Sequence, residues 1–333
     1  MRYRTLGRTG KRVSEIGLGA WELGGAYFLR GRSSANSDPA GYDDVAEAEA
    51  IGTIHWGLDH GLDFIDTAPI YGDGESERRV ARALAGRPER VTVETKLCVF
   101  AEDGHYRRVF TRDAVLREVD RSRQRLGVAT IDIDLLHSPS REEFGDGESL
   151  AALQELKAQG TVRWIGVSAS YDSEHTLELV RTGALDVLQI PLSVLRPDFA
   201  REVLPEARSR NIGVVVREPL ANGYLTGAFD ENTTFRPDDQ RSVWPRERHL
   251  ELVRKARALA FLVTPTRSLA QASLAWLLAQ DGVSTVIAGS ANRQQLEWNM
   301  ATSDLPPLTT DELERVARLQ ETDFGSNSTV AVR

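Results

Sequence analysis

Short apolar runs alternate with helical patterns along most of this chain, and this alternation restricts its fold more than any other feature. Many helical patterns place apolar residues three and four positions apart, as at Leu150, Leu153 and Leu156. The strands are too apolar to have a face in water, so they indicate a parallel sheet covered by helices. The predicted strands are Glu15–Trp21, Asp63–Thr67, Val91–Lys96, Ile131–His137, Arg163–Ser168, Leu185–Pro191, Ile212–Glu218 and Thr285–Gly289.

Eight such strands are the number that closes a barrel, so we predict the α/β class and a (β/α)8 TIM barrel. An open, doubly wound sheet is the competing architecture, and its dinucleotide sites carry G-x-G-x-x-G after the first strand. Here Gly17 and Gly19 are present, but Glu22 stands where the third glycine would be. The sequence therefore favours the closed barrel.

Several segments extend this plan. A β-hairpin around the turn Gly7–Gly10 is predicted to open the chain. Long segments at Gly24–Asp43 and Thr226–Arg246 follow the first and seventh strands, and we interpret them as lids over a substrate or cofactor. A helix over Thr309–Leu319, which begins with a capping box, precedes a polar tail from Gln320. We expect residues 1–333 to form a single barrel domain.

The composition argues against several classes of partner. The net charge of −8 comes from interspersed signs without a basic block, so no nucleic-acid partner is expected. Cys98 is the only cysteine, which excludes an internal disulfide and fits a reducing compartment. The first residues lack the apolar stretch of a secretory signal, and no run of about 18 apolar residues would span a membrane. We expect a cytoplasmic protein without a membrane partner.

Three predicted strands end at or near an ionisable residue, namely Asp66, Lys96 and His137. Successive parallel strands end at one rim of a barrel, and this C-terminal rim carries the catalytic groups of (β/α)8 enzymes. Tyr71 lies a short turn beyond Asp66. Taken alone, each residue has a structural alternative: a turn cap, a solvated lysine, a turn histidine or a tyrosine packed over the barrel mouth. Together they indicate an enzyme.

These residues lie in strings that resemble a known family. The strings DTAPIYG at 66–72, ETK at 94–96 and LLH at 135–137 are similar to the Asp, Tyr, Lys and His tetrad of the aldo-keto reductases. The likeness covers nearly the whole chain through RTLGRTG at 4–10, GVS at 166–168, PLANG at 219–223 and GS at 289–290. The resemblance implies hydride transfer between NAD(P)H and the carbonyl of an aldehyde or ketone, with a small carbonyl or alcohol as the substrate.

The resemblance also implies a role for each residue of the tetrad. Tyr71 would be the general acid and base, and His137 would orient the carbonyl. Lys96 would lower the pKa of Tyr71, and Asp66 would hold Lys96 in place. The electrostatics agree with these roles, because a phenol with an ordinary pKa of about 10 is a weak acid and a nearby ammonium favours the phenolate.

The end of the eighth strand is a candidate phosphate site, because barrels bind phosphate with their last loops and the N-terminus of a short helix. Here Gly289 and Ser290 precede a helix that begins near Arg293. By resemblance, the cofactor contacts are Gly19, Ala20, Trp21, Ser168, Gln189, Arg217, Pro219, Leu220, Asn222, Gly289, Ser290, Asn292, Arg293, Gln295 and Asn299.

Three positions depart from the family pattern. Ala169 stands where an asparagine is usual, and Arg217 stands near the place of an aromatic residue that stacks on the nicotinamide ring. A guanidinium plane can also stack on a ring. Asn292 stands where relatives often carry a cation, with Arg293 one place along. On the strength of Arg293 we favour NADP(H), with NAD(H) as the alternative.

Two other functions compete with a reductase. In a barrel lyase Lys96 would form a Schiff base, and in a cofactor-sensing regulatory subunit the nucleotide would bind without turnover. A metal site is not expected, because the His, Asp and Cys residues lack close ligand spacing. Trp21, Tyr27 and Phe28 are the predicted substrate contacts. The sequence leaves the substrate, the net direction of reaction and the oligomeric state open.

Overall fold

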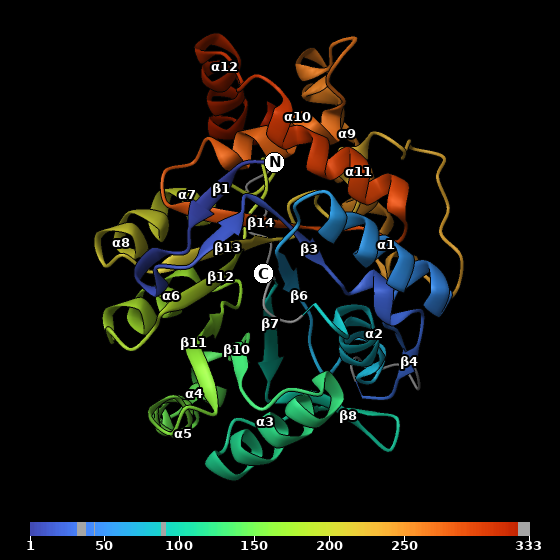
Figure 1. Ribbon diagram of the computed structural model, residues 1–333. Helices are drawn as coiled ribbons and strands as arrows, with labels where there is room; N and C mark the ends of the chain where they lie inside the picture. Colours follow the sequence, from blue (N-terminus) through green and yellow to red (C-terminus); the bar gives the residue numbers. More distant parts are fainter. Residues whose placement is uncertain (32–37, 43, 88–90, 326–333) are drawn as a thin grey trace.

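The eight predicted strands close into one barrel (Figure 1). The computed structural model describes residues 1–31, 38–42, 44–87 and 91–325. Around the barrel the order is β10-β11-β12-β13-β14-β3-β6-β7, and all neighbouring pairs are parallel. The strands are β3 Ile16–Gly19, β6 Phe64–Asp66, β7 Thr92–Leu97, β10 Ile131–His137, β11 Val162–Ser168, β12 Val187–Pro191, β13 Gly213–Arg217 and β14 Val283–Gly289. The predicted (β/α)8 barrel is confirmed.

Helices surround the barrel (Figure 1). None of the described helices is both long and apolar enough to cross a membrane. The last helix has the predicted capping box, in which Thr309 Oγ1 accepts from Glu312 N at 3.2 Å and Thr309 N donates to Glu312 Oε2 at 2.8 Å. The helices are α1 Glu47–Asp59, α2 Glu75–Leu84, α3 Arg112–Leu126, α4 Arg141–Phe144, α5 Glu148–Ala158, α6 Ser173–Arg181, α7 Asp198–Glu202, α8 Leu204–Ser209, α9 Arg246–Ala258, α10 Leu269–Leu278, α11 Arg293–Ala301 and α12 Thr310–Glu321.

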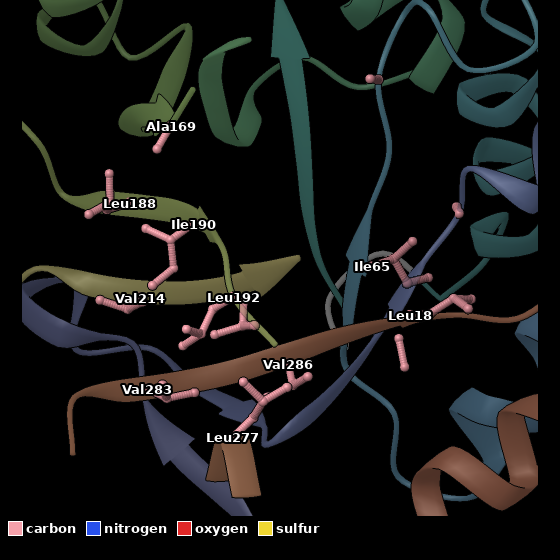
Figure 2. Packing of buried hydrophobic residues seen from close by; sticks show 14 of the residues in the cluster. Leu18, Ile65, Ala169, Leu188, Ile190, Leu192, Val214, Leu277, Val283 and Val286 are labelled. Atoms are coloured by element: carbon pink, nitrogen blue, oxygen red, sulfur yellow. The ribbon is translucent and has the colours of Figure 1, made fainter. Parts of the chain in front are cut away.

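The alternation of side chains along each strand divides the core into two parts. The outer part lies between the strands and the helices, and Figure 2 shows Leu188, Ile190, Val214 and Val286 within it. The inner part consists of Leu6, Val13, Phe64, Ile133, Leu135, Val187, Val215 and Ile287, with Trp164 packed against them. Full burial of one such side chain contributes about 1.5–3 kcal/mol, so both layers hold the strand ends firmly.

The N-terminal hairpin closes one end of the barrel. Its strands, β1 Tyr3–Thr5 and β2 Arg12–Ser14, pair antiparallel as predicted. Leu6 between them is fully buried and belongs to the inner core. It packs so closely that a methyl group on Gly213 would lie 2.7 Å from Leu6 Cγ. A ligand must therefore enter from the opposite, C-terminal rim.

Additional segments surround that rim. The strands β4 Phe28–Leu29 and β5 Asp38–Pro39 pair antiparallel, and so do β8 Val99–Glu102 and β9 His105–Arg108. Neither pair is predicted by the sequence. The segment after β13 contains the 3-10 helices η4 Tyr224–Thr226 and η5 Gln240–Val243. Parts of the predicted first lid (residues 32–37 and 43) and the end of the tail (326–333) lie outside the described residues.

The two predicted lids contact each other within the described residues. Gln240 N donates to Gly41 O at 3.0 Å. Tyr42 Oη donates to Asn222 Oδ1 at 2.9 Å, and the Arg241 guanidinium carbon lies 4.5 Å from the centre of the Tyr42 ring. The assignment of these segments as lids stays a prediction, but these contacts join the loops after β3 and β13.

Candidate active site

The structure brings together three strand-end residues that the sequence singled out. Asp66 ends β6, Lys96 lies one residue before the end of β7, and His137 ends β10. These strands are neighbours in the barrel. The ammonium of Lys96 is fully buried and donates to Asp66 Oδ1, to Thr67 O at 3.0 Å and to Tyr71 Oη at 3.1 Å. All three donors of this ammonium are therefore used.

Tyr71 reaches Lys96 from the turn after β6. Its ring stacks on Trp21, with centres 5.7 Å apart and planes 10° apart, and Trp21 Nε1 donates to Ala40 O at 3.0 Å. The next residue, Gly72, has φ 61, and a side chain there would collide with the carbonyl of Gly24. The loop after β3 and the glycine at 72 thus fix the position of the phenol.

Burial, not Lys96, decides the protonation of Tyr71. Burial raises the pKa of Tyr71 to about 12, although the positive charge of Lys96 acts in the opposite direction. Burial likewise acts to lower the pKa of Lys96, but the negative groups around it, Asp66 foremost among them, together outweigh burial and leave that pKa above its ordinary value. Lys96 acts on the pKa of Tyr71 in the predicted direction, but the net pKa lies above the ordinary value of a phenol. The cause is desolvation, which the sequence does not reveal.

His137 is neutral and faces Tyr71. The two rings meet edge to face, with centres 6.2 Å apart. Burial lowers the pKa of His137 well below its ordinary value, and the positive charges of Lys96, Arg217 and Arg108 add to this. His137 Nδ1 is buried and has no hydrogen-bond partner among the described residues. A neutral imidazole can donate one hydrogen bond to a carbonyl oxygen without carrying charge.

A second layer of polar groups lies inside the barrel beneath the tetrad. Gln189 Nε2 donates to Asp66 Oδ1 at 2.8 Å and to Glu94 Oε1 at 2.5 Å, while Ser168 Oγ donates to Gln189 Oε1 at 3.0 Å. Strand β12, which carries Gln189, is not a neighbour of β6 or β7, so these bonds cross the interior. The predicted contacts of Ser168 and Gln189 with the cofactor stay predictions, since here both residues bond to protein.

Glu94 is a buried polar residue of this layer to which the sequence analysis assigned no role. It is fully buried, and burial followed by the negative charge of Asp66 raises its pKa well above the ordinary value. Burial and Asp66 therefore both favour the protonated form of the Glu94 carboxyl group. The available signal was its place two residues before Lys96 on the same strand, which directs both side chains to the same face.

Two glycines and a buried serine lie at the rim between β3 and β14. Gly19 and Gly289 are paired across these strands, and a methyl group on Gly19 would lie 3.5 Å from Gly289 N. The carboxyl group of Glu22 lies against Gly289. Ser290 is fully buried beside it, and its Oγ accepts from Asn299 Nδ2 at 3.0 Å.

The start of α11 follows directly and is capped by its own residues. Asn292 Oδ1 accepts from Gln295 N at 3.0 Å, and Gln295 Oε1 accepts from Ala291 N at 2.9 Å. The Arg293 guanidinium carbon lies 5.4 Å from the centre of the Trp56 ring. Phosphates bind well at helix N-termini, so this position suits the nucleotide, but the cofactor contacts of these side chains stay predictions.

The other predicted contacts lie at the same rim with different surroundings. Arg217 Nη2 donates to Ala169 O at 3.1 Å, and Arg217 also pairs with Glu218. Ala20 is buried, and Pro219 and Leu220 lie in the turn after β13. Of the predicted substrate contacts, Trp21 stacks on Tyr71 and Tyr27 bonds to Ile70 O next to it. Phe28 lies in β4 with 53% of its surface exposed.

Two other chemistries find no support in the described part of the chain. No group of three or more His, Cys, Asp or Glu side chains there could hold a metal ion. Cys98 is fully buried, and burial raises the pKa of its thiol, which makes it a poor nucleophile.

Comparison with known proteins decides the family. A profile of the Aldo/keto reductase family matches residues 15–321. The chain belongs to this family. It is accordingly an NAD(P)-dependent oxidoreductase that interconverts carbonyls and alcohols.

Individual relatives agree with this assignment. The chain is 31% identical over 320 residues to an NADH-specific methylglyoxal reductase of Escherichia coli, covering 92% of this chain and 94% of that one. It is 29% identical over 325 residues to the aldo-keto reductase YhdN of Bacillus subtilis, covering 93% of each. Among solved structures, the glycerol dehydrogenase AKR11B4 from Gluconobacter oxydans is 28% identical with a TM-score of 0.79, over 99% of this chain and 98% of that one.

Proposed function

We propose that this enzyme reduces small polar aldehydes or ketones, with Tyr71 as the proton donor and His137 as the group that holds the carbonyl. The observation that carries this proposal is the arrangement at one mouth of a protonated phenol, an ammonium 3.1 Å from its oxygen and a neutral imidazole. Methylglyoxal and glycerol, which appear in the names of two relatives, suggest a substrate of about three carbons.

The bound nicotinamide would supply the hydride, because no protein side chain can. In the proposed reaction Tyr71 Oη and His137 both donate hydrogen bonds to the carbonyl oxygen. As that oxygen becomes an alkoxide it takes the proton of Tyr71, because an alkoxide is a much stronger base than a phenolate. Lys96 stabilises the phenolate that remains, and Asp66 holds Lys96 at that place. A positioned general acid contributes about 10²- to 10⁴-fold to a rate.

The alternatives are less well supported by the same geometry. A Schiff base requires a neutral amine, but Lys96 is an ammonium with all three donors in hydrogen bonds. A regulatory subunit without turnover would not need an assembled tetrad, and here all four side chains meet.

For the nucleotide we propose NAD(H). A pocket of about 440 Å³ at the start of α11 is lined by Glu49, Asn292, Arg293, Gln294 and Glu297. Two carboxylates face this pocket against one guanidinium. A carboxylate suits the ribose 2′-hydroxyl of NAD(H), whereas a cation suits the 2′-phosphate of NADP(H). The sequence-based preference for NADP(H) depended on Arg293 and does not gain support from this pocket.

The test is a nucleotide titration followed by a panel of carbonyls. Quenching of tryptophan fluorescence should give a lower Kd for NADH than for NADPH, and oxidation of NADH should follow the addition of methylglyoxal or glyceraldehyde. Nucleotide binding without turnover of any carbonyl would favour the regulatory subunit. Trapping of a substrate on Lys96 by borohydride would favour the lyase.

A further inference from the structure

An acidic side chain lies where the phosphates of the nucleotide are expected. Glu22 begins the 3-10 helix η2 Glu22–Gly24, just after β3 and Trp21. Its carboxyl group is pressed against Gly289, the last residue of β14. A methyl group built on Gly289 would lie 2.6 Å from both Cδ and Oε2 of Glu22. Gly289 is followed directly by Ser290 and the start of α11, so the carboxyl group lies on the floor of the proposed cofactor site.

The groups around Glu22 do not fix its charge. Arg241, on the segment after β13, is the cation that faces it, but Arg241 Nε donates to Asp239 Oδ1 at 2.9 Å and Arg241 Nη1 donates to Asn222 O at 3.0 Å. No ion pair between Glu22 and Arg241 occurs among the described side chains. Asp66 on β6 faces Glu22 with a negative charge, and Tyr42 lies close enough for Glu22 to disfavour its phenolate.

These surroundings allow the carboxyl group to exist both as the protonated acid and as the carboxylate. Burial raises the pKa of Glu22 to about 7, with its own backbone N–H and Arg241 acting in the opposite direction and Asp66 in the same direction. At neutral pH a large fraction of the molecules therefore carries a proton on Glu22.

We propose that the dinucleotide binds when Glu22 is protonated, so that its binding takes up about one proton. This inference depends on the proposed function, because it assumes that the diphosphate lies at Gly289 and Ser290. A carboxylate in contact with a diphosphate repels it strongly at a partly buried site. The protonated acid has an O–H group that can donate to a phosphate oxygen instead.

The Kd of the nucleotide should depend on pH through Glu22. A bound diphosphate disfavours the carboxylate, so Glu22 has a higher pKa in the complex than in the free protein. Below about pH 7 the proton is already present, and the Kd stays constant. Above about pH 7 the proton must be supplied on binding, and the Kd increases by up to tenfold for each pH unit.

The experiment measures the Kd of NADH by tryptophan fluorescence from about pH 6 to about pH 9. NADH is the probe because it lacks the 2′-phosphate of NADPH, which itself titrates at about pH 6. Calorimetry in two buffers of different ionisation enthalpy at pH 8 gives the number of protons taken up. Glu22→Gln should give a constant Kd over the whole range and bind NADH at least about tenfold more tightly than the wild type near pH 8.5.

Two further variants complete the design. Glu22→Ala should have the same flat profile, which protects the test against a defect specific to the glutamine. Glu314→Gln, on α12 with 61% of the Glu314 side chain exposed, should keep the wild-type slope. Thermal unfolding by circular dichroism establishes that each variant is folded.

The outcomes separate this inference from the proposed function. A Kd for wild-type NADH binding that does not change with pH, or a Glu22→Gln variant that keeps the wild-type slope, overturns the inference alone. Absence of NADH binding at every pH, in all variants, overturns the proposed function and this inference with it. Uptake of about one proton in the wild type and none in Glu22→Gln supports both.

Discussion

The inside of the barrel and the rim proposed to bind the nucleotide are built differently. Inside, Gln189 joins Asp66 and Glu94 through buried hydrogen bonds that cross between distant strands. At the rim, Arg293 packs on Trp56 and is exposed to water, and Glu22 faces Gly289 without an ion pair among the described residues.

This difference indicates whether the charges of each region are arranged before the ligand binds or only when it binds. The interior is organised before any ligand binds, as catalysis requires of groups that stabilise developing charge. The rim carries negative groups that the nucleotide must neutralise, displace or avoid. Mutations inside should therefore change the chemical step or the stability, and mutations at the rim should change nucleotide affinity.

The largest expected effect is on the chemical step. Tyr71→Phe should lower kcat about a thousandfold, because it removes the proton donor while keeping the ring that stacks on Trp21. The Kd for NADH should stay within about twofold of the wild type, since Tyr71 acts on the carbonyl and not on the nucleotide. Steady-state kinetics and fluorescence titration measure the two quantities. Tyr3→Phe, in the hairpin at the opposite end of the barrel, is the matched control, and an unchanged kcat in Tyr71→Phe would remove Tyr71 from this role.

The second prediction concerns pH at saturating nucleotide. Because the pKa of Tyr71 is about 12, its hydroxyl stays protonated at neutral pH. Titration of Tyr71 should therefore not change the rate of single-turnover reduction between about pH 6 and about pH 9. Oxidation of the alcohol needs the phenolate, whose population grows about tenfold per pH unit below the pKa. Oxidation should therefore accelerate over the same range. A plateau in the oxidation rate below about pH 9 would contradict this protonation state.

The main architecture was predictable because it depends on local patterns. Buried parallel strands have continuous apolar sequences, and their shared direction places Asp66, Lys96 and His137 at one rim. The hairpin β8–β9 was not predicted. It begins directly after Cys98, whose φ of 72 lies in a region that favours glycine, so no turn residue in the sequence marks its start. Helix α1 was also missed, as Gly52 and Gly57 interrupt its pattern.

The parts of the site that escaped prediction depend on burial and on distant contacts. The bond from Gln189 to Glu94 joins residues 95 positions apart. No local pattern encodes that distance. The raised pKa of Tyr71 has the same origin, because desolvation comes from the assembled barrel and outweighs the neighbouring Lys96. The resemblance identified the four residues of the tetrad but not their protonation states.

A smaller effect is expected from the polar layer below the tetrad. Glu94→Ala should lower the free energy of unfolding by about 2–3 kcal/mol, because Gln189 Nε2 loses an acceptor and a buried cavity remains. Glu94→Gln keeps an acceptor oxygen and nearly the same volume, so it should cost less than about 1 kcal/mol. Urea unfolding monitored by circular dichroism measures both. If the Glu94→Ala and Glu94→Gln variants had the same free energy of unfolding, the hydrogen bond across the interior would contribute little to stability.

The smallest expected effect is at the nucleotide rim, where the charges are exposed and screened. The double change Glu49→Gln and Glu297→Gln should tighten NADPH binding by about three- to tenfold, because it removes two carboxylates from the pocket at the start of α11. The Kd for NADH should change little, and the gain for NADPH should shrink at about 0.5 M salt, where charges beyond a few ångströms are screened. Fluorescence titrations of both nucleotides against the wild type and Glu314→Gln provide the measurement. A wild-type enzyme that already binds NADPH more tightly than NADH, with no response to the double change, would show that these carboxylates do not select the nucleotide.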